Sequence, residues 1–234
     1  MSKVLVALDV ATAREALSLA GRLQPHVLGF KLGLELLMGE GPSVVSEVVG
    51  LGSPVFVDAK LHDIPNTVAG AAERLGALGA RWVTVHASGG EEMVRVAVEA
   101  LNEGSGGAAG VLAVTVLTSL DQHELARLGR SDPLEVQVSR LASVAAGGGA
   151  EGVVCAVGEV RLVKDLALGL TVVTPGIRPA GSAPSDQKRM ATPSEAMRAG
   201  SDLLVVGRPI TSAPDVVEAA RAITAEIEAT VSAT

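Results

Sequence analysis

Eight short apolar runs, spaced at regular intervals, constrain the fold of this chain more than any other feature of its sequence. Most are continuously apolar and rich in Val, Leu or Ile, which is typical of parallel strands covered on both faces. The runs occupy residues 4–8, 27–31, 54–58, 82–86, 111–116, 152–156, 170–174 and 203–206. They recur about every 29 residues, which is the size of a strand-plus-helix module.

Amphipathic, Ala-rich segments of helical length separate the runs. We expect helices over residues 13–23, 91–101, 133–146 and 214–227. Eight alternating units favour a closed (β/α)8 TIM barrel over an open doubly wound sheet. No Gly-rich dinucleotide turn follows the first run, where Asp9 begins the segment Asp-Val-Ala-Thr. We therefore predict an α/β protein with a single barrel domain over residues 1–234.

Composition excludes several classes of partner. The net charge is -7 and aromatic residues make up 1%, whereas nucleic-acid surfaces combine basic patches with aromatic platforms. No apolar run approaches membrane-spanning length, and the amino terminus has no secretory pattern, so we expect a cytoplasmic protein without membrane contact. The single cysteine, Cys155, lies in an apolar run and is expected to be a small core residue.

Charged residues recur where the predicted strands end. Active sites of such barrels form at the carboxyl ends of the strands. Candidate site residues therefore follow from position alone: Asp9, Lys31, Asp58, Lys60, His86, residues 115–119, residues 174–178 and residues 206–209. Charged groups of both signs should converge at this end of the barrel.

The densest charge cluster consists of Asp58, Lys60 and Asp63. The period-2 geometry of a strand sends Asp58 and Lys60 to one face, and a turn before Pro65 lets Asp63 curl back toward them. Opposite charges at close range keep each other ionised, so Lys60 is a candidate proton donor. A buried structural ion pair or a solvated strand end is the alternative for this cluster.

Two features after the last strands suit a phosphate group. Gly207 lets a backbone N–H approach an anion, and Arg208 supplies a fork of donors at a position where such barrels bind phosphate. The long polar segment at about residues 178–191 is expected to be a lid that brings Gln187 to the same phosphate. A disordered insertion is the alternative for this segment.

Several motifs in order, covering nearly the whole chain, closely resemble the orotidine 5'-phosphate decarboxylase family. They are FKLG at 30–33, DAKLHDIPNT at 58–67, VHA at 85–87, LTS at 117–119, TPGIR at 174–178, DQ at 186–187 and VVGRPI at 205–210, with Asp9 after the first run. The resemblance implies cofactor-free and metal-free decarboxylation of orotidine 5'-monophosphate to UMP, in de novo pyrimidine synthesis.

The resemblance also implies a role for each matching residue. Lys60 would protonate C6 of the pyrimidine, Asp58 would lie against the departing carboxylate, and Lys31 and Asp63 would complete an alternating Lys-Asp network. The family's homodimer implies that Asp63, Ile64 and Thr67 serve the neighbouring subunit's site. The remaining implied contacts are Asp9 and Thr67 to ribose, Thr118 to the pyrimidine region, and Arg178, Gln187, Gly207 and Arg208 to the phosphate.

Two other functions compete with this interpretation. A metal-dependent sugar-phosphate decarboxylase or aldolase would favour an acidic ligand on the second strand, where this chain has Lys31. A non-catalytic phosphate-binding barrel would have no use for two lysines and two aspartates on one face. His86 is interpreted as a hydrogen-bonded structural group, and the role of His62 stays open.

Overall fold

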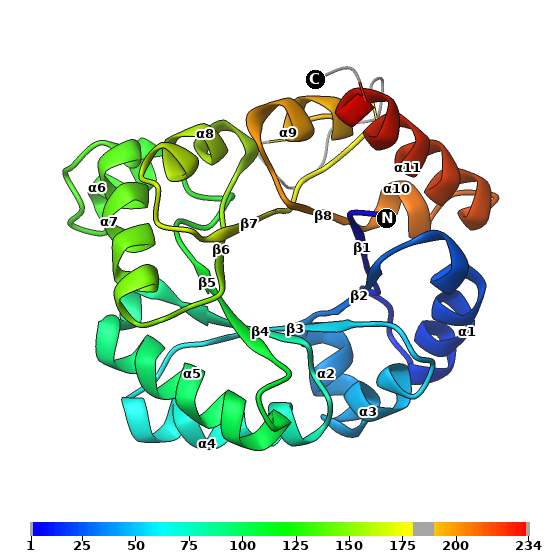
Figure 1. The fold of residues 1–234 in the computed structure, drawn as a ribbon, viewed down its shortest axis with the longest axis horizontal. Coiled ribbons are helices and arrows are strands. Elements are labelled where there is room, and N and C mark those ends of the chain that lie inside the picture. The colour runs from blue at the N-terminus through cyan, green and yellow to red at the C-terminus, as the bar shows by residue number, and fades with distance from the viewer. Residues whose placement is uncertain (1, 180–189, 233–234) are drawn as a thin grey trace.

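The structure, a computed structural model, describes residues 2–179 and 190–232, and these residues form a closed barrel of eight parallel strands. Each strand pairs with the next, and β8 pairs with β1 to close the ring at the centre of the fold (Figure 1). The strands are β1 (Val4–Ala7), β2 (Gly29–Leu32), β3 (Val55–Leu61), β4 (Trp82–His86), β5 (Gly110–Val114), β6 (Gly152–Val154), β7 (Thr171–Thr174) and β8 (Leu203–Val206). The predicted barrel is confirmed.

Helices surround this ring on the outside (Figure 1). They are α1 (Ala13–Leu23), α2 (Leu34–Glu40), α3 (Ser43–Val49), α4 (Pro65–Ala77), α5 (Glu91–Ser105), α6 (Gln122–Arg127), α7 (Leu134–Gly147), α8 (Val157–Asp165), α9 (Pro193–Ala199), α10 (Arg208–Thr211) and α11 (Val216–Ser232), with short 3-10 turns η1 (Gln24–His26) and η2 (Ala87–Gly89). The four predicted helices correspond to α1, α5, α7 and α11. None of the described helices is both long and apolar enough to cross a membrane.

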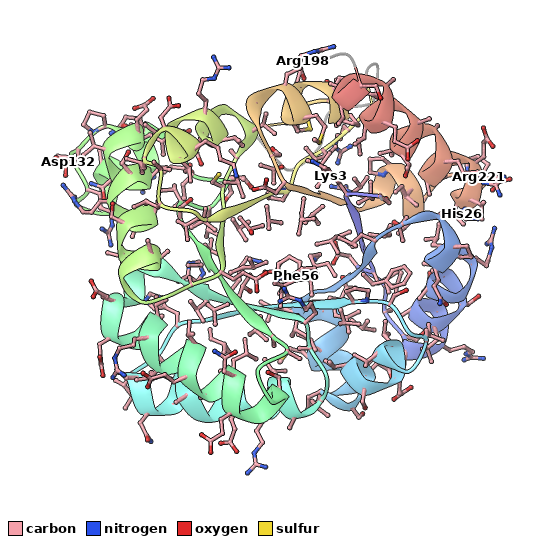
Figure 2. All side chains as sticks on the ribbon, in the orientation of Figure 1. Lys3, His26, Phe56, Asp132, Arg198 and Arg221 are labelled. Carbon is pink, nitrogen blue, oxygen red and sulfur yellow. The ribbon has the colours of Figure 1, made fainter. Side chains whose placement is uncertain are left out.

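The strands are apolar on both faces because each contributes to two cores. One core fills the space between strands and helices, and a smaller one fills the barrel interior. Phe56 occupies the centre of the barrel, whereas Asp132, Arg198 and Arg221 lie on the outer rim (Figure 2). The interior core consists of Leu5, Ala7, Phe56, Trp82, Leu112, Val173 and Val205. The side of this core that faces the carboxyl ends of the strands supports the residues located there.

An ion cluster closes the opposite, amino-terminal end of the barrel. Arg81 donates two hydrogen bonds of 2.8 Å to the Glu151 carboxylate, and Nε1 of Trp82 donates a third of the same length. The Arg81 guanidinium also lies 4.5 Å from the centre of the Trp82 ring. This cluster joins the starts of β4 and β6 across Gly110 of β5, where a side chain would collide with Glu151.

The two ends of the segment predicted as a lid are joined by backbone hydrogen bonds. Arg178 N–H donates to the Ala191 carbonyl at 2.9 Å, and Ala191 N–H donates to the Gly176 carbonyl at 3.2 Å. The interior of the predicted lid, including Gln187, lies outside the described residues. The hydrogen-bonded base therefore fixes where residues 178–191 leave and rejoin the barrel.

Candidate functional site

A cavity of about 610 Å³ opens at the carboxyl ends of the strands. Its floor includes Phe56 and Val205 of the interior core. Eight of the predicted site residues line it, namely Asp9, Lys31, Asp58, Lys60, Thr118, Arg178, Gly207 and Arg208. The barrel thus brings together residues that are up to 199 positions apart, from Asp9 to Arg208.

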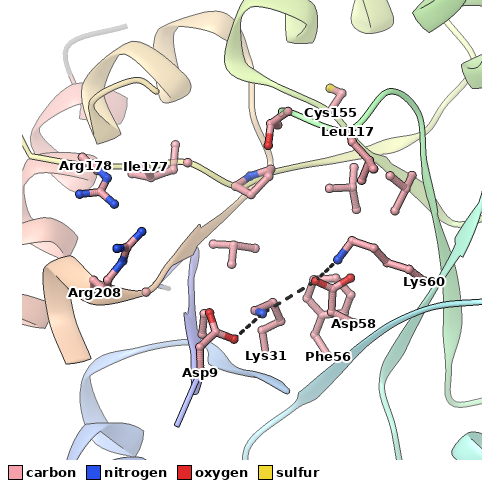
Figure 3. Close-up of a pocket in the computed structure, with 18 of the residues that line it drawn as sticks. Asp9, Lys31, Phe56, Asp58, Lys60, Leu117, Cys155, Ile177, Arg178 and Arg208 are labelled. Atoms are coloured by element: carbon pink, nitrogen blue, oxygen red, sulfur yellow. Dashed lines mark hydrogen bonds and ion pairs between the residues drawn. The ribbon is translucent and has the colours of Figure 1, made fainter. Parts of the chain in front are cut away.

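Four side chains form a line of alternating charge along one side of this cavity (Figure 3). Lys31 Nζ lies 2.8 Å from Asp9 Oδ1 and 3.8 Å from Asp58 Oδ2. Lys60 Nζ lies 2.6 Å from the same Asp58 oxygen. Asp9, which the sequence connected only with ribose, is therefore also the first member of the ion-pair line.

Asp58 is the centre of the line and is held ionised. Burial by itself would raise the pKa of this carboxyl. The charges of Lys31 and Lys60, with hydrogen bonds from Lys60 and Thr84, outweigh burial and hold the pKa below its usual value. A carboxylate with a lowered pKa stays negative at neutral pH, so both lysines keep their counter-charge.

The backbone reaches this arrangement through an irregularity in β3. Val57 pairs with Val83 and Leu61 with Val85, so Asp58, Ala59 and Lys60 all lie opposite the single residue Thr84. Lys60 adopts a left-handed backbone conformation with φ of 48°. The expectation that Asp58 and Lys60 share a face is confirmed, but its reason was wrong, because regular period-2 alternation does not continue through residues 58–60.

Asp63, Ile64 and Thr67 lie away from the cavity of their own chain. All three are exposed, and Ile64 is 66% accessible. Asp63 Oδ1 accepts a hydrogen bond of 2.6 Å from the N–H of Ile64 instead of approaching Lys60. The expectation that Asp63 curls back toward its own strand was therefore wrong, because its carboxylate binds the turn that leads into α4.

Two arginines border the side of the cavity opposite Lys60. Arg178 follows β7 and Arg208 follows β8, and Figure 3 shows their guanidinium groups on the same side. Gly207 lies beside them and lines the cavity. Two fixed positive charges and a backbone N–H at one rim form a good environment for a phosphate dianion.

Sequence reasoning assigned no site role to Thr84 or Gly33. Thr84 is completely buried and contacts both Asp58 and Lys60. Gly33 follows β2, and a Cβ there would lie 2.9 Å from Asp9 Oδ1 and 3.0 Å from Lys31 Nζ. The signals were a hydroxyl inside a Val-rich strand and a glycine two residues after a site lysine, and both are common in proteins without such roles.

His86 and His62 lie beside the Lys60 end of the line. Their ring centres are 5.4 Å apart. Burial lowers the pKa of His86, the charges of His62 and Lys60 lower it further, and Asp58 opposes them. His86 is therefore neutral at pH 7, and its expected structural role stays a prediction. Cys155 is buried, as expected, and also lines the cavity.

Comparisons with known proteins agree with this geometry. The family model of "Orotidine 5'-phosphate decarboxylase / HUMPS family" matches residues 2–223. Orotidine 5'-phosphate decarboxylase of Anaeromyxobacter sp. is 51% identical over 224 residues, covering 95% of this chain and 97% of the relative. The enzyme of the same name from Thermobifida fusca is 47% identical over 229 residues, covering 97% of this chain and 96% of the relative. A crystal structure of the Lactobacillus acidophilus enzyme superimposes with a TM-score of 0.84 at 37% identity, covering 97% of this chain and 99% of that one.

Proposed function

The chain belongs to the orotidine 5'-phosphate decarboxylase / HUMPS family, and we propose that it converts orotidine 5'-monophosphate to UMP by the residues described above. Relatives about half identical over nearly their whole length carry the decarboxylase name, so an enzyme of pyrimidine biosynthesis follows from the family. We place this step in the cytoplasm, as expected for a biosynthetic enzyme acting on a small phosphorylated metabolite.

The reaction breaks the bond between C6 and the carboxylate carbon. Carbon dioxide leaves, and the electron pair stays on C6 as a vinyl-type carbanion without enolate delocalisation. The Lys60 ammonium stabilises this charge, transfers one proton to C6, and regains a proton from solvent after product release. Because Lys60 is already fixed by Asp58 at 2.6 Å, little reorganisation is needed as the negative charge develops.

Asp58 and Lys31 prepare the site for this step. The ionised Asp58 faces the substrate carboxylate, and like-charge repulsion raises the energy of the bound ground state relative to the transition state. Lys31 balances Asp58 from the other side and holds Asp9 at 2.8 Å. Asp9 then presents its second oxygen to a ribose hydroxyl. No metal or organic cofactor takes part in the proposed steps.

The phosphate is proposed to bind far from the reacting carbon. Arg178, Arg208 and the Gly207 N–H supply donors, and Gln187 joins them as the lid over residues 178–191 closes. Thr118, which lines the cavity, contacts the pyrimidine. Binding energy from the phosphate can be expressed as turnover because it holds the closed state in which water is excluded.

We further propose a homodimer with shared sites. Asp63, Ile64 and Thr67 are exposed beside the mouth of the barrel, where a second copy can receive them. Asp63 would complete the network and Thr67 the ribose contacts of the partner. Mixing Lys60→Ala and Asp63→Asn subunits, each inactive alone, should restore roughly a quarter of the sites by random pairing. Absence of restored activity in a proven mixed dimer would reject sharing.

The position of Lys31 argues against the metal-dependent alternative. Its ammonium lies between the Asp9 and Asp58 carboxylates, in the space that a divalent ion bound by both would have to occupy. A non-catalytic phosphate-binding barrel would need the two arginines, but it would not need an ion-pair line on the other side of the same cavity.

One observation carries the proposal: Lys60 lies against Asp58 at one side of the cavity, and Arg178 and Arg208 lie at the other. The test is a spectrophotometric assay with orotidine 5'-monophosphate in the presence of EDTA. We expect conversion to UMP at an unchanged rate when EDTA is added. Folded protein that does not convert this substrate would refute the proposal, and turnover of a keto-sugar phosphate instead would support the metal-dependent alternative.

A further inference from the structure

Thr84 lies at the point where β3 departs from regular pairing. Trp82 and Thr84 are two residues apart on β4 and therefore both face the barrel interior. Thr84 is completely buried there. Its hydroxyl donates a hydrogen bond of 2.9 Å to Asp58 Oδ1 and accepts one of 2.9 Å from the backbone N–H of Lys60. One side chain thus binds both members of the Asp58–Lys60 pair.

The hydrogen bond from Thr84 gives the two oxygens of the Asp58 carboxylate different partners. Oδ1 is bound by Thr84, which leaves Oδ2 for the ammonium groups of Lys60 at 2.6 Å and Lys31 at 3.8 Å. A carboxylate fixed through one oxygen cannot rotate about its Cβ–Cγ bond without losing that hydrogen bond. The direction in which Oδ2 holds the two ammonium groups is therefore set from β4.

The same hydroxyl also stabilises an unfavourable backbone conformation. A non-glycine residue with φ of 48°, as at Lys60, is strained and persists only where the surroundings enforce it. The Lys60 N–H is removed from the strand ladder by the bulge, and the Thr84 hydroxyl is the acceptor that satisfies it. Without that acceptor the N–H would be unsatisfied in a partly buried position.

We propose that Thr84 is a positioning residue for decarboxylation: its hydroxyl bridges Asp58 and the Lys60 backbone, and so holds the proton donor in its productive orientation. The inference rests on the proposed function, because it assigns Thr84 a role in the step that Lys60 performs. Thr84 itself contacts no substrate in this scheme. Its effect on turnover passes through the two residues that it binds.

The test compares three variants with the wild-type enzyme. Thr84→Val keeps the shape of the side chain and removes the hydroxyl, Thr84→Ser keeps the hydroxyl, and Thr230→Val is the matched control. Thr230 is also buried, and its hydroxyl bonds Ser194 Oγ and the Glu226 carbonyl in the outer helical layer. We expect kcat to fall about 10- to 100-fold in Thr84→Val with little change in KM. Thr84→Ser should stay within about 3-fold of wild type and Thr230→Val should keep its kcat.

A pH profile provides a readout that a merely structural role would not move. Asp58 faces Lys31 on β2 and Lys60 on its own strand, with His86 on β4 nearby, and the Thr84 hydrogen bond helps to keep its pKa low. Thr84→Val should therefore move the acidic limb of kcat/KM to higher pH, whereas Thr230→Val should not.

The outcomes separate this inference from the proposed function. If the wild type converts orotidine 5'-monophosphate but folded Thr84→Val has the kcat and acidic limb of Thr230→Val, the inference is wrong. If the wild type does not convert this substrate, the proposed function fails first. Should Thr84→Val not fold, Thr84→Ala removes the same hydroxyl without the added methyl and is subject to the same expectations.

Discussion

The two ends of the barrel are built from the same kinds of residue but are organised for opposite purposes. At the amino end, Arg81, Trp82 and Glu151 satisfy one another with three hydrogen bonds of 2.8 Å. At the carboxyl end, charges also pair, but the pairs border an open cavity of about 610 Å³. Ion pairs alone therefore do not distinguish a structural cluster from a functional site.

The two ends differ in the partners of the central carboxylate and in the backbone conformation beside it. Both oxygens of Glu151 accept hydrogen bonds from Arg81 and Trp82. These hydrogen bonds and the charge of Arg81 outweigh burial of the carboxyl and lower its pKa. Asp58 instead divides its oxygens between Thr84 and two lysines, one of them in a left-handed conformation. The carboxyl end accepts local strain to keep an ammonium group beside the cavity.

Among the tests of this contrast, Lys60→Ala has the largest expected effect. Removing the proposed proton donor and its charge should lower kcat by at least about 10³-fold, because general-acid and electrostatic contributions are lost together. Binding of UMP and the Tm should change little, because the substitution does not relieve the backbone strain at residue 60 and does not change the packing of the core. Steady-state kinetics, calorimetric titration with UMP and thermal melting check these three expectations. Near-normal turnover would remove Lys60 from the mechanism.

The next test inserts a methyl group into the ion-pair line. Gly33→Ala would place Cβ 2.9 Å from Asp9 Oδ1 and 3.0 Å from Lys31 Nζ, so the pair must shift. We expect kcat/KM to fall about 10- to 100-fold, the cost of misplacing site groups by a fraction of an ångström to one ångström. Gly21→Ala is the matched control, because no atom lies within 4 Å of the added Cβ and alanine favours the α1 helix. Equal activity of the two variants would show that the line tolerates displacement.

At the other end of the barrel, Glu151→Gln should affect stability and not turnover. It removes the negative charge opposite Arg81 and replaces one accepting oxygen with an NH2 group in a partly exposed site, so we expect a loss of about 1–3 kcal/mol in the free energy of unfolding and a Tm lower by about 2–10 °C. At 25 °C, kcat should be unchanged. Glu99→Gln, which removes an exposed ion pair with Arg95, should barely alter the Tm. A fall in kcat with an unchanged Tm would contradict the assigned division between the ends.

The smallest expected effect concerns His86 and the pH dependence of stability. Its folded pKa lies below the usual 6.5, so the unfolded chain binds a proton that the folded protein does not bind. The free energy of unfolding should therefore decrease as pH falls below about 6.5 and level off below the folded pKa. Asp58 contributes in a separate window, because its lowered pKa makes stability decline only below about 3.8. Urea unfolding between pH 5 and 8 should show a shallower decline in His86→Gln, and parallel curves would contradict this assignment.

The fold could be predicted because its signal is distributed over the whole chain. Eight doubly covered strands require eight continuous apolar runs, and each run was visible. The end of β3 was missed, since the predicted run stopped at Asp58 while pairing with β4 continues to Leu61. The apolar pattern of a strand reflects burial, whereas the extent of the strand is defined by backbone hydrogen bonds. The two differ where the end of a strand contributes polar residues to a site.

Part of the membership of the site could be predicted from the sequence, but its contacts could not. Strand-end position and motif identified Lys31, Asp58, Lys60 and Arg208, all of which line the cavity. The assignment of Asp63 to its own chain's cluster failed, because the turn before α4 binds its carboxylate. The proposed sharing of Asp63 between two copies depends on a surface that the sequence pattern does not describe.

By itself, then, the sequence determined the eight-unit barrel, the end of it that carries charge, and the residue types available there, because these depend on periodicity and on order along the chain. The tertiary structure alone decided that Asp9 pairs with Lys31, that Lys60 takes a left-handed conformation, and that Thr84 binds both Asp58 and Lys60. Each of these depends on the register between neighbouring strands. A bulge of this kind moves side chains by several ångströms and so changes which atoms are in contact. It does not change the pattern of residues that encodes the strands.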